Sequence, residues 1–472
     1  MGQQNRARLW EAWRAAGVHG RIASSVIAVA MATAVVKLGG LAKVMVVARR
    51  FGAGDELDAF LIAFLVPSFI AEFVAGSVAA ALIPAFVEQS ERAGAAAARR
   101  LLAEAAAAVL LLLLLLTALI GFFTNAVVAT LASGFGPAKA ALAVSLLRLM
   151  LPIALFSGLA SVSRAVLTAL GRFALAASVP AITPLAIIAS LFLAPASWRV
   201  AALALGTLCG SALELLIAVV ALRSLDFLVL PRWRGLNPAL VQVLRQYAPM
   251  VGAFTLLAAS GLVDQTMAAS LGSGSVSILS YGVRLNTFIL AMGPAVVATA
   301  VFPHFSRLVA REDWIELRRS LRLLLPALFL ASLPLTLLLA AFSAPLVRLL
   351  LQQGAFSQAD THMVAAVQRL ALLQLPFAFL AVPAARLVSA LKANAVLFRA
   401  ALLHLLANVL FDLLFIRWLG VAGIGLASAC VLAVDCCYLL FALSSRLNPD
   451  RPTVVFLTSP ALPRPAPDQG AW

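Results

Sequence analysis

The stretch Val109–Phe123 (VLLLLLLLTALIGFF) decides the fold class of this chain, because it carries no charged residue and is apolar on every side. Leu323–Phe342 (LLLPALFLASLPLTLLLAAF) has the same character. With their flanks, both stretches are long enough to cross the ~30 Å hydrocarbon core of a bilayer as helices. The strands of a membrane β-barrel would instead alternate apolar and polar residues. The sequence therefore predicts an all-α integral membrane protein.

The composition extends this prediction to the whole chain. Of its 472 residues, 63% are apolar and 11% are charged, whereas roughly a quarter of the residues of a soluble protein are charged. Apolar stretches recur along the sequence and predict about twelve transmembrane helices. The lipid bilayer is thus the first partner that we expect.

The net charge of +16 needs a separate explanation. In a soluble protein it would suggest a nucleic-acid partner, but in a membrane protein it is typical of cytoplasmic loops rich in Lys and Arg. Arginines precede the first predicted span and follow the second, sixth, eighth and last spans, whereas 271–278 has no Lys or Arg and 124–139 has only Lys139. We therefore expect no nucleic acid, and both termini on the cytoplasmic side.

An internal repeat organises the sequence. At a shift of about 220 residues, SLLRLM of Ser145–Met150 aligns with AVQRLA of Ala366–Ala371, and Leu205–Glu214 aligns with Leu426–Asp435. The second alignment places one buried acid, Glu214, on another, Asp435. Each half holds about six spans, and an even number returns the chain to its starting side, so we predict two parallel repeats about an axis along the membrane normal.

The repeat sets the predicted domain organisation, which has two six-helix lobes, a linker and two tails. The N-terminal tail carries Trp10 and Trp13 among arginines and is typical of an interfacial segment, and the C-terminal tail is rich in proline. We predict a cytoplasmic or interfacial tail at 1–21, an N-lobe at 22–223, a cytoplasmic linker at 224–245, a C-lobe at 246–446 and a disordered cytoplasmic tail at 447–472.

Ionisable residues inside predicted spans are the first candidates for function, because charge at membrane depth is costly and usually faces a cavity or a partner. Lys37 and Lys43 lie in the first span, and Arg284 lies in the eighth. Six residues on an ideal helix separate the two lysines by roughly 120° of rotation. A bend at Gly39 and Gly40 would let both face one cavity, and the alternative is one lysine inward and one snorkelling to the interface.

Several acids and polar groups accompany these cations. Asp58 and Glu72 bound the second span, and Asp264 lies in the seventh. We interpret these three acids as cavity or coupling groups, with two alternatives: Asp58 as an N-cap in GDELDAF, and Glu72 as a partner that neutralises Lys37 or Lys43. In the eleventh span, polar residues recur at helical spacing and predict a proton or cation relay or a structural hydrogen-bonded cluster: His404, Asn408 and Asp412.

A cationic pocket between two lobes favours an anionic substrate such as a phosphate or pyrophosphate. The sequence has no GxxxxGK[ST] loop, no zinc motif and no Ser-His-Asp set, so we expect a transporter that is neither an enzyme nor an ATPase. The four cysteines lie in predicted spans, where thiols act as small apolar side chains, and we expect no cofactor and no metal. Transport would then depend on an ion gradient, the membrane potential or consumption of the product.

Longer motifs carry a family resemblance. VARRFGAGDELDAFLIAFLVPSF at 47–69 continues into GSVAAALIPAF at 76–86, and both resemble the signature of the MurJ/MviN lipid II flippases. GSVSILSYGVRLNTFILAMGPAVVATAVFPHFSRL at 274–308 and QQGAFSQADT at 352–361 are similar to later segments of the same family. The resemblance implies a V-shaped fold of the multidrug/oligosaccharidyl-lipid/polysaccharide (MOP) exporter superfamily, to which the MATE transporters also belong. It also implies a monomer in the bacterial inner membrane.

The resemblance also implies roles for particular residues. The family's central cationic cavity holds the pyrophosphate of an undecaprenyl-linked sugar, and its two first-helix arginines fall on Lys37 and Lys43, while Arg284 and Asp58 match directly. The chain departs from the pattern at Val44 and Val283, where the family has acids, and at its second-helix arginine, where Ala71 or Glu72 stands. The sequence also ends after the twelfth predicted span, whereas the lipid II flippases have two more helices.

These features leave three kinds of function open. The leading expectation is a flippase for a polyprenyl-pyrophosphate-linked glycan, either lipid II for the cell wall or a related oligosaccharide for an exopolysaccharide, coupled to H⁺, Na⁺ or the membrane potential. The second is a MATE-like drug or cation antiporter, which would need acidic rather than basic cavity residues. The third is a membrane scaffold, for which buried charges would have no purpose.

Overall fold

The computed structural model describes residues 28–225, 227, 238–391 and 393–447, and every regular element in them is helical. Both predicted tails, 1–21 and 447–472, lie outside these ranges except for Leu447. Nine of the described helices are long and apolar enough to cross a membrane, or ten when the bent pair α13–α14 counts as one span. Two further helices, α9 and α10, have 32 and 36 residues and exceed the ~20 residues that a crossing needs. The predicted all-α membrane fold is therefore confirmed.

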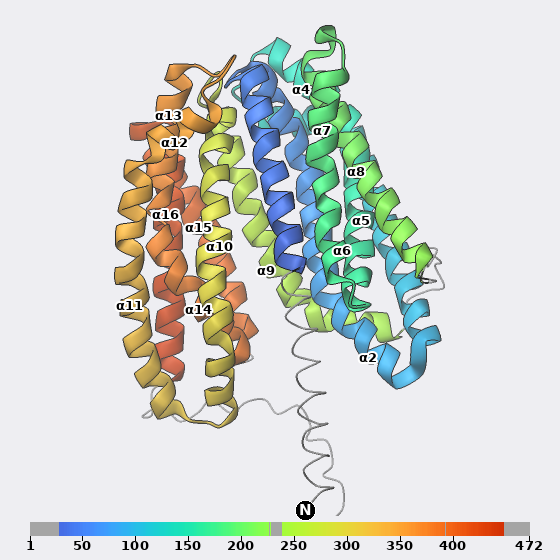
Figure 1. Cartoon of the computed structure of the whole chain (residues 1–472), viewed down its shortest axis with the longest axis vertical. Helices are drawn as coiled ribbons and strands as arrows, with labels where there is room; N and C mark the ends of the chain where they lie inside the picture. Colours follow the sequence, from blue (N-terminus) through green and yellow to red (C-terminus); the bar gives the residue numbers. More distant parts are fainter. Residues whose placement is uncertain (1–27, 226, 228–237, 392, 448–472) are drawn as a thin grey trace, which may run out of the picture.

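The helices gather into two groups, which Figure 1 shows side by side. The first group, the N-lobe, packs α2 against α4 and α5, α5 against α8, and α7 against α8. Its elements are the first helix Ala28–Phe51, α2 (Asp55–Phe122), α3 (Thr124–Leu131), α4 (Pro137–Met150), α5 (Pro152–Ala169), α6 (Phe173–Ser178), η1 (Val179–Ala181), α7 (Ile182–Leu193), η2 (Ala196–Trp198) and α8 (Arg199–Ser224).

The second group, the C-lobe, packs α10 against α13 and α14, and α16 against α13, α14 and α15. Its first helix, α9, also packs against α2 of the N-lobe, and it begins at Pro238, inside the segment predicted as a linker. The elements are α9 (Pro238–Ala269), α10 (Ser275–Ala310), α11 (Trp314–Ala341), α12 (Ser343–Leu351), α13 (Gln358–Leu372), α14 (Leu375–Ala390), α15 (Asn394–Leu419) and α16 (Val421–Arg446).

Prolines and glycines explain where long apolar stretches break. The 68-residue α2 contains two candidate spans, Asp55–Val74 and Ala96–Phe122, and between them Gly94 has a φ of +81°, which glycine adopts without steric cost. Proline stands at the start of both α4 and α5, where its missing N–H leaves no helical hydrogen bond unmade.

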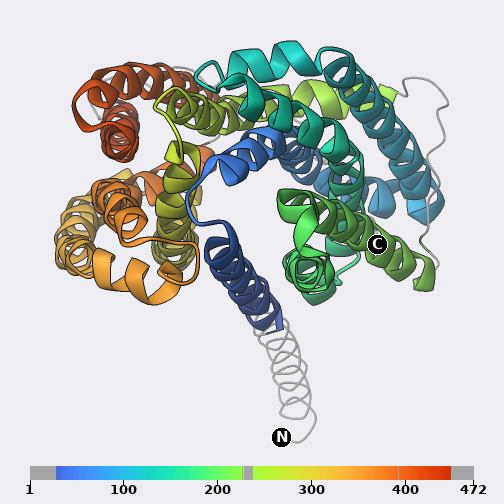
Figure 2. The ribbon, with the colours of Figure 1, turned by 90° about the horizontal axis from the view of Figure 1, so that it is seen from above.

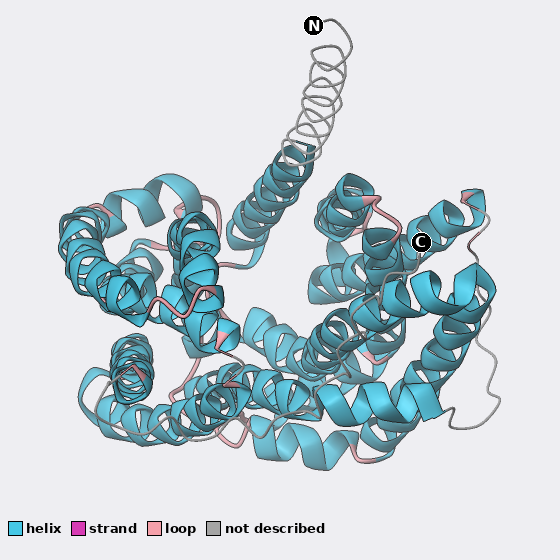
Figure 3. Cartoon of the chain, turned by 90° about the horizontal axis from the view of Figure 1, so that it is seen from below, coloured by secondary structure: helices cyan, strands magenta, loops and turns pink. Residues whose placement is uncertain are grey.

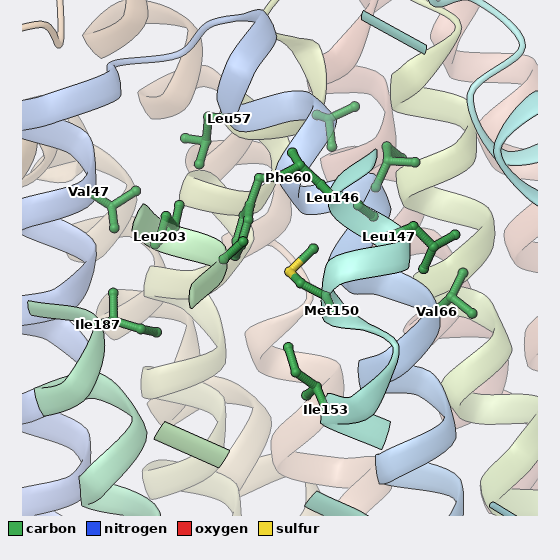
Figure 4. Close-up of a cluster of buried hydrophobic side chains, with 14 of the residues drawn as sticks. Val47, Leu57, Phe60, Val66, Leu146, Leu147, Met150, Ile153, Ile187 and Leu203 are labelled. Atoms are coloured by element: carbon green, nitrogen blue, oxygen red, sulfur yellow. The ribbon is translucent and has the colours of Figure 1, made fainter. Parts of the chain in front are cut away.

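One hydrophobic core fills the N-lobe and reaches the C-lobe at one end of the molecule. Figure 4 shows part of it, with Leu57 and Phe60 of α2 and Leu147 and Met150 of α4 in one cluster. The same cluster continues to Leu279 of α10, whereas a second core lies wholly within the C-lobe. The views from above and below show the first helix between the two groups (Figures 2 and 3). The lobes therefore share packing at one end, which we call the closed end.

Candidate substrate cavity, gate and ion site

A cavity of about 90 Å³, partly open to solvent, lies between the lobes and is lined by two of the predicted cationic residues. Lys43 of the first helix contributes from the N-lobe, and Arg284 of α10 contributes from the C-lobe. The aromatic rings of Phe60 and Phe64 add apolar surface. Five hydroxyl side chains complete its polar lining: Thr183, Thr207, Ser277, Ser280 and Tyr281.

The two cations are close enough to repel each other electrostatically. Neither forms an ion pair with any residue that the structure describes. Glu72 interacts attractively with Arg284, but Glu72 itself is exposed. Two like charges held in one cavity without ion-pair partners favour an anion that both can contact, since charge-assisted hydrogen bonds are about twice as strong as neutral ones.

The structure separates the two lysines that the sequence grouped. The first helix is continuous through Gly39 and Gly40, so the chain does not unwind there in this conformation. Lys37 is half-buried and is not one of the described residues that line the cavity with Lys43. The reason is the unbroken helical rotation of roughly 120° between the two positions. A Cβ on Gly40 would meet no atom within 4 Å, so close packing does not explain this glycine.

Asp58 closes one end of the molecule rather than capping its own helix. The N-cap of α2 is Gly54, and Asp58 is 0% exposed. Its carboxylate accepts hydrogen bonds from the backbone N–H of Gly274 and of Ser277, and from the Ser277 hydroxyl, all at 2.8 Å. These groups begin α10, whose first N–H groups have no partner within the helix. Asp58 of the N-lobe therefore caps a helix of the C-lobe.

Lys139 completes this network, and the sequence reasoning did not assign it to a site. Its ammonium group lies 2.7 Å from a carboxylate oxygen of Asp58 and 2.7 Å from one of Asp55, and 4.1 Å from the ring centroid of Phe135. Lys139 is the only cation in 124–139, and DELD is rich in acids, so a signal existed. Nothing in the sequence, however, brings together two segments 81 residues apart.

A second contact at the closed end joins two backbones. The N–H of Ala355 donates to the carbonyl of Arg49 at 2.9 Å, and the Tyr281 hydroxyl donates to the carbonyl of Gly52 at 3.3 Å. Gly52 and Gly354 both have a φ of +59°, and a Cβ on Gly354 would lie 2.3 Å from the Arg49 oxygen. Only glycine fits this approach, which explains GAF within the QQGAFSQADT motif.

The turn at 49–56 is held on its own lobe as well. Arg50 donates to the carbonyl of Leu191 in α7, and Glu56 pairs with Arg199 at the start of α8. The turn is therefore fixed to the N-lobe, and separation of the lobes at this end would break its contacts with α10 and with 354–355. We call these contacts, made by Asp58, Lys139, Gly52 and Gly354, the gate.

A third cluster lies inside the C-lobe, away from the cavity. The Asn408 amide donates to Asp264 at 2.8 Å, which joins α15 to α9. Asp412 is 0% exposed, its oxygens accept no hydrogen bond from a described donor, and it lies close enough to Asp264 for the two acids to interact. Two neighbouring buried carboxylates repel unless a proton or a cation joins them.

The predicted relay in the eleventh span is divided in the structure. Asn408 and Asp412 belong to the cluster with Asp264, whereas His404 contacts Asp435 of α16, with 2.5 Å between Nδ1 and Oδ2. The repeat alignment had already drawn attention to Asp435, but not to its partner. α15 therefore carries two polar sites: Asn408 and Asp412 lie beside α9, and His404 lies beside α16.

The fold matches solved membrane transporters. An inward-facing multidrug resistance MATE family transporter of the MOP superfamily superposes with a TM-score of 0.70 at 15% identity, covering 87% of this chain and 95% of that one. A structure described as lipid II flippase MurJ in an inward closed conformation superposes with a TM-score of 0.77 at 24% identity, covering 89% and 87%. This chain therefore has the fold of the MOP-type membrane transporters.

Sequence comparisons narrow this class to a family. The chain belongs to the family described as lipid II flippase MurJ, whose model matches residues 47–460. The lipid II flippase MurJ of Burkholderia cenocepacia is 28% identical over 71% of this chain and 66% of its own length. The probable lipid II flippase MurJ of Buchnera aphidicola (Acyrthosiphon pisum) is 27% identical over 73% and 68%. The chain thus spans about two thirds of these relatives, and 81% of a Synechocystis relative that is 26% identical over 89% of this chain.

Proposed function

We propose that this chain is a flippase that moves a polyprenyl-pyrophosphate-linked peptidoglycan precursor, lipid II, across the bacterial inner membrane. The observation that carries the proposal is the cavity that Lys43 of the N-lobe and Arg284 of the C-lobe both line. Family membership supports lipid II over an exopolysaccharide unit, because the matched relatives are named for lipid II. Two cavity cations also disfavour a cationic drug as substrate.

The pyrophosphate is the part of the substrate that Lys43 and Arg284 would bind. A pyrophosphate group offers several anionic oxygens, so both cations can contact it at once, and the planar guanidinium of Arg284 can bind two of its oxygens. The pyrophosphate would thereby relieve the repulsion between the two side chains. The undecaprenyl tail would stay in the lipid, because it is too apolar to enter a charged cavity.

The gate defines which state the proposed cycle starts from. With both termini cytoplasmic, the closed end is periplasmic, and the cavity is reached from the cytoplasm, where lipid II is made. Release on the other side would require the lobes to part at the gate, breaking the Asp58 contacts with α10 and the Ala355–Arg49 hydrogen bond. Each residue of this gate therefore contributes to the balance between inward and outward states.

A coupling ion would bind at the acid pair of the C-lobe. Asp264 and Asp412 lie on α9 and α15, and α9 also packs against α2 of the N-lobe. A cation or proton that joins the two carboxylates would change how α9 packs on α15, and this would couple ion binding to lobe movement. The work of transport is then done by an ion gradient or the membrane potential, and the chain acts as a transporter and not as an enzyme.

The proposal is tested by removing each cavity charge in the full chain. Lys43→Ala and Arg284→Ala are each expected to abolish rescue of a strain depleted of its own lipid II flippase, with unchanged membrane expression. Lys43→Arg is expected to retain rescue, because it keeps the charge. Arg417→Ala, which removes an exposed charge at the end of α15, is the matched control and should rescue fully. Rescue by the Lys43→Ala/Arg284→Ala double variant would overturn the proposed site.

A further inference from the structure

Each lobe contains a buried acid that is hydrogen-bonded to the neighbouring helix in the same way. The Thr183 hydroxyl of α7 donates to Glu214 of α8 at 2.6 Å, and His404 of α15 contacts Asp435 of α16 at 2.5 Å. In both pairs the partners are 31 residues apart. The repeat shift of about 220 residues that aligns Glu214 with Asp435 also aligns Thr183 with His404. The two pairs therefore stand at equivalent positions of the two repeats.

The two positions differ in how the acid is neutralised. In the N-lobe, Arg164 of α5 lies close enough to Glu214 to attract it, so a permanent positive charge faces the acid. The repeat places Ala385 where Arg164 stands, and no described Lys or Arg pairs with Asp435. The second oxygen of Asp435, Oδ1, is buried and accepts no hydrogen bond within the described ranges. Among the described residues, the partner that can carry positive charge in an ion pair with Asp435 is His404.

The charges around His404 are negative on the two helices that pack most closely against it. Asp435 comes from α16, and Asp264 of α9 interacts with His404 electrostatically. On α15 itself, Asp412 lies about two turns away. The remaining neighbour, α14, has one ionisable side chain, Arg386, which is exposed and forms no ion pair in the described structure. Three acids, one histidine and the exposed Arg399, five residues before His404 on α15, therefore lie in this part of the lobe.

We propose that His404 and Asp435 form a proton-binding site of the C-lobe, distinct from the acid pair Asp264 and Asp412, and that Thr183 and Glu214 are its permanently neutralised counterpart. Neutral His404 donates its Nδ1–H to Asp435, and a proton taken up at Nε2 converts this hydrogen bond into an ion pair. A buried carboxylate without another counter-charge favours that protonated form. This inference rests on the proposed function only for its role in transport, because proton binding itself is independent of the substrate.

The site would make proton binding oppose cation binding. A proton on His404 adds positive charge near Asp264, which weakens the attraction of the acid pair for a coupling cation. Conversely, a cation at the acid pair would make His404 harder to protonate. The two sites are thermodynamically linked, and the effect of each on the other must be equal.

Nitrogen NMR of the full chain tests proton binding directly. The chain has four histidines, so ¹⁵N-histidine labelling gives few signals, and His404→Thr assigns one of them by its loss. We expect the His404 signal to change with pH as the ring takes up a proton at Nε2. Asp435→Asn should alter this response, because the counter-charge is removed. Glu214→Gln, the matched N-lobe variant, should leave the response unchanged.

The transport assay then separates a proton site from a mere structural clamp. His404→Thr introduces the residue type that stands at the equivalent N-lobe position, so it offers a hydroxyl group near Asp435 but no imidazole that can take up a proton. In proteoliposomes we expect wild-type lipid II transport to change several-fold with pH and the His404→Thr rate to stay flat. Glu214→Gln, whose residue does not line the cavity, should keep the wild-type pH profile. A His404 signal that does not titrate, or an unchanged pH profile in His404→Thr, would overturn the inference. Wild-type protein that titrates but moves no lipid II would instead refute the proposed function alone.

Discussion

Removal of the Asp58 carboxylate is the sharpest test of the gate. Asp58 is fully buried, pairs with Lys139 at 2.7 Å and accepts three hydrogen bonds from the start of α10. Lys139 belongs to the same lobe as Asp58, so only the three hydrogen bonds to α10 are lost when the gate opens. A hydrogen bond to a charged group contributes about 1.5–3 kcal/mol, so the three together contribute about 4 kcal/mol or more. Because each 1.4 kcal/mol is a factor of ten, Asp58→Ala should shift the ratio of closed to open gate about a thousandfold toward open. Asp58→Asn keeps one acceptor oxygen and should cost about 2 kcal/mol.

Distances across the closed end measure this shift. Spin labels at Ala138 of α4 and Ala359 of α13, both exposed, would report the separation of the lobes by double electron–electron resonance in a variant without the four native cysteines. Arg199→Ala is the matched control. Arg199 pairs with Glu56 within the N-lobe, and its side chain is 70% exposed, so its loss should cost less than about 1 kcal/mol and leave the distances unchanged. A wild-type distance distribution in Asp58→Ala would refute the assignment of Asp58 to the gate.

Three further predictions concern single residues. Gly354→Ala should weaken the gate, because its Cβ would lie 2.3 Å from the Arg49 oxygen, and the same spin labels should report opening. Gly420→Ala is the control: Gly420 has a similar positive φ but lies in open space, so this variant should leave the spin-label distances unchanged. Gly40→Ala should fold normally and keep the wild-type melting temperature, since its Cβ meets no atom within 4 Å. Slower transport by this variant would then indicate that the first helix bends during the cycle. Asp412→Asn should raise thermal stability without added cation, because it removes one of two repelling buried carboxylates. In a melting assay the variant should no longer be stabilised by Na⁺ or by low pH. If Na⁺ or low pH stabilised it as much as wild type, the acid pair would be excluded as the ion site.

The sequence was sufficient for the fold class because membrane insertion depends on local composition. Stretches such as Val109–Phe123 have no soluble alternative, and the charged loops between them fix the expected topology. The repeat was also visible, since it is a relation between residue types at a constant shift, and it named Glu214 and Asp435 as equivalent acids before either had a partner. The candidate cations Lys43 and Arg284 followed from the high cost of charge at membrane depth.

The tertiary structure decided which of these residues meet. Asp58 finds its partners 81 and 219 residues away, and Asp264 finds Asn408 at a separation of 144. Lys37 parts from Lys43 because the helix between them stays unbroken, and His404 parts from Asn408 because each points to a different neighbouring helix. Hydropathy and periodicity report the surroundings of each residue along one helix. Contacts between helices depend instead on how two lobes pack against each other, and this packing is a property of the whole chain.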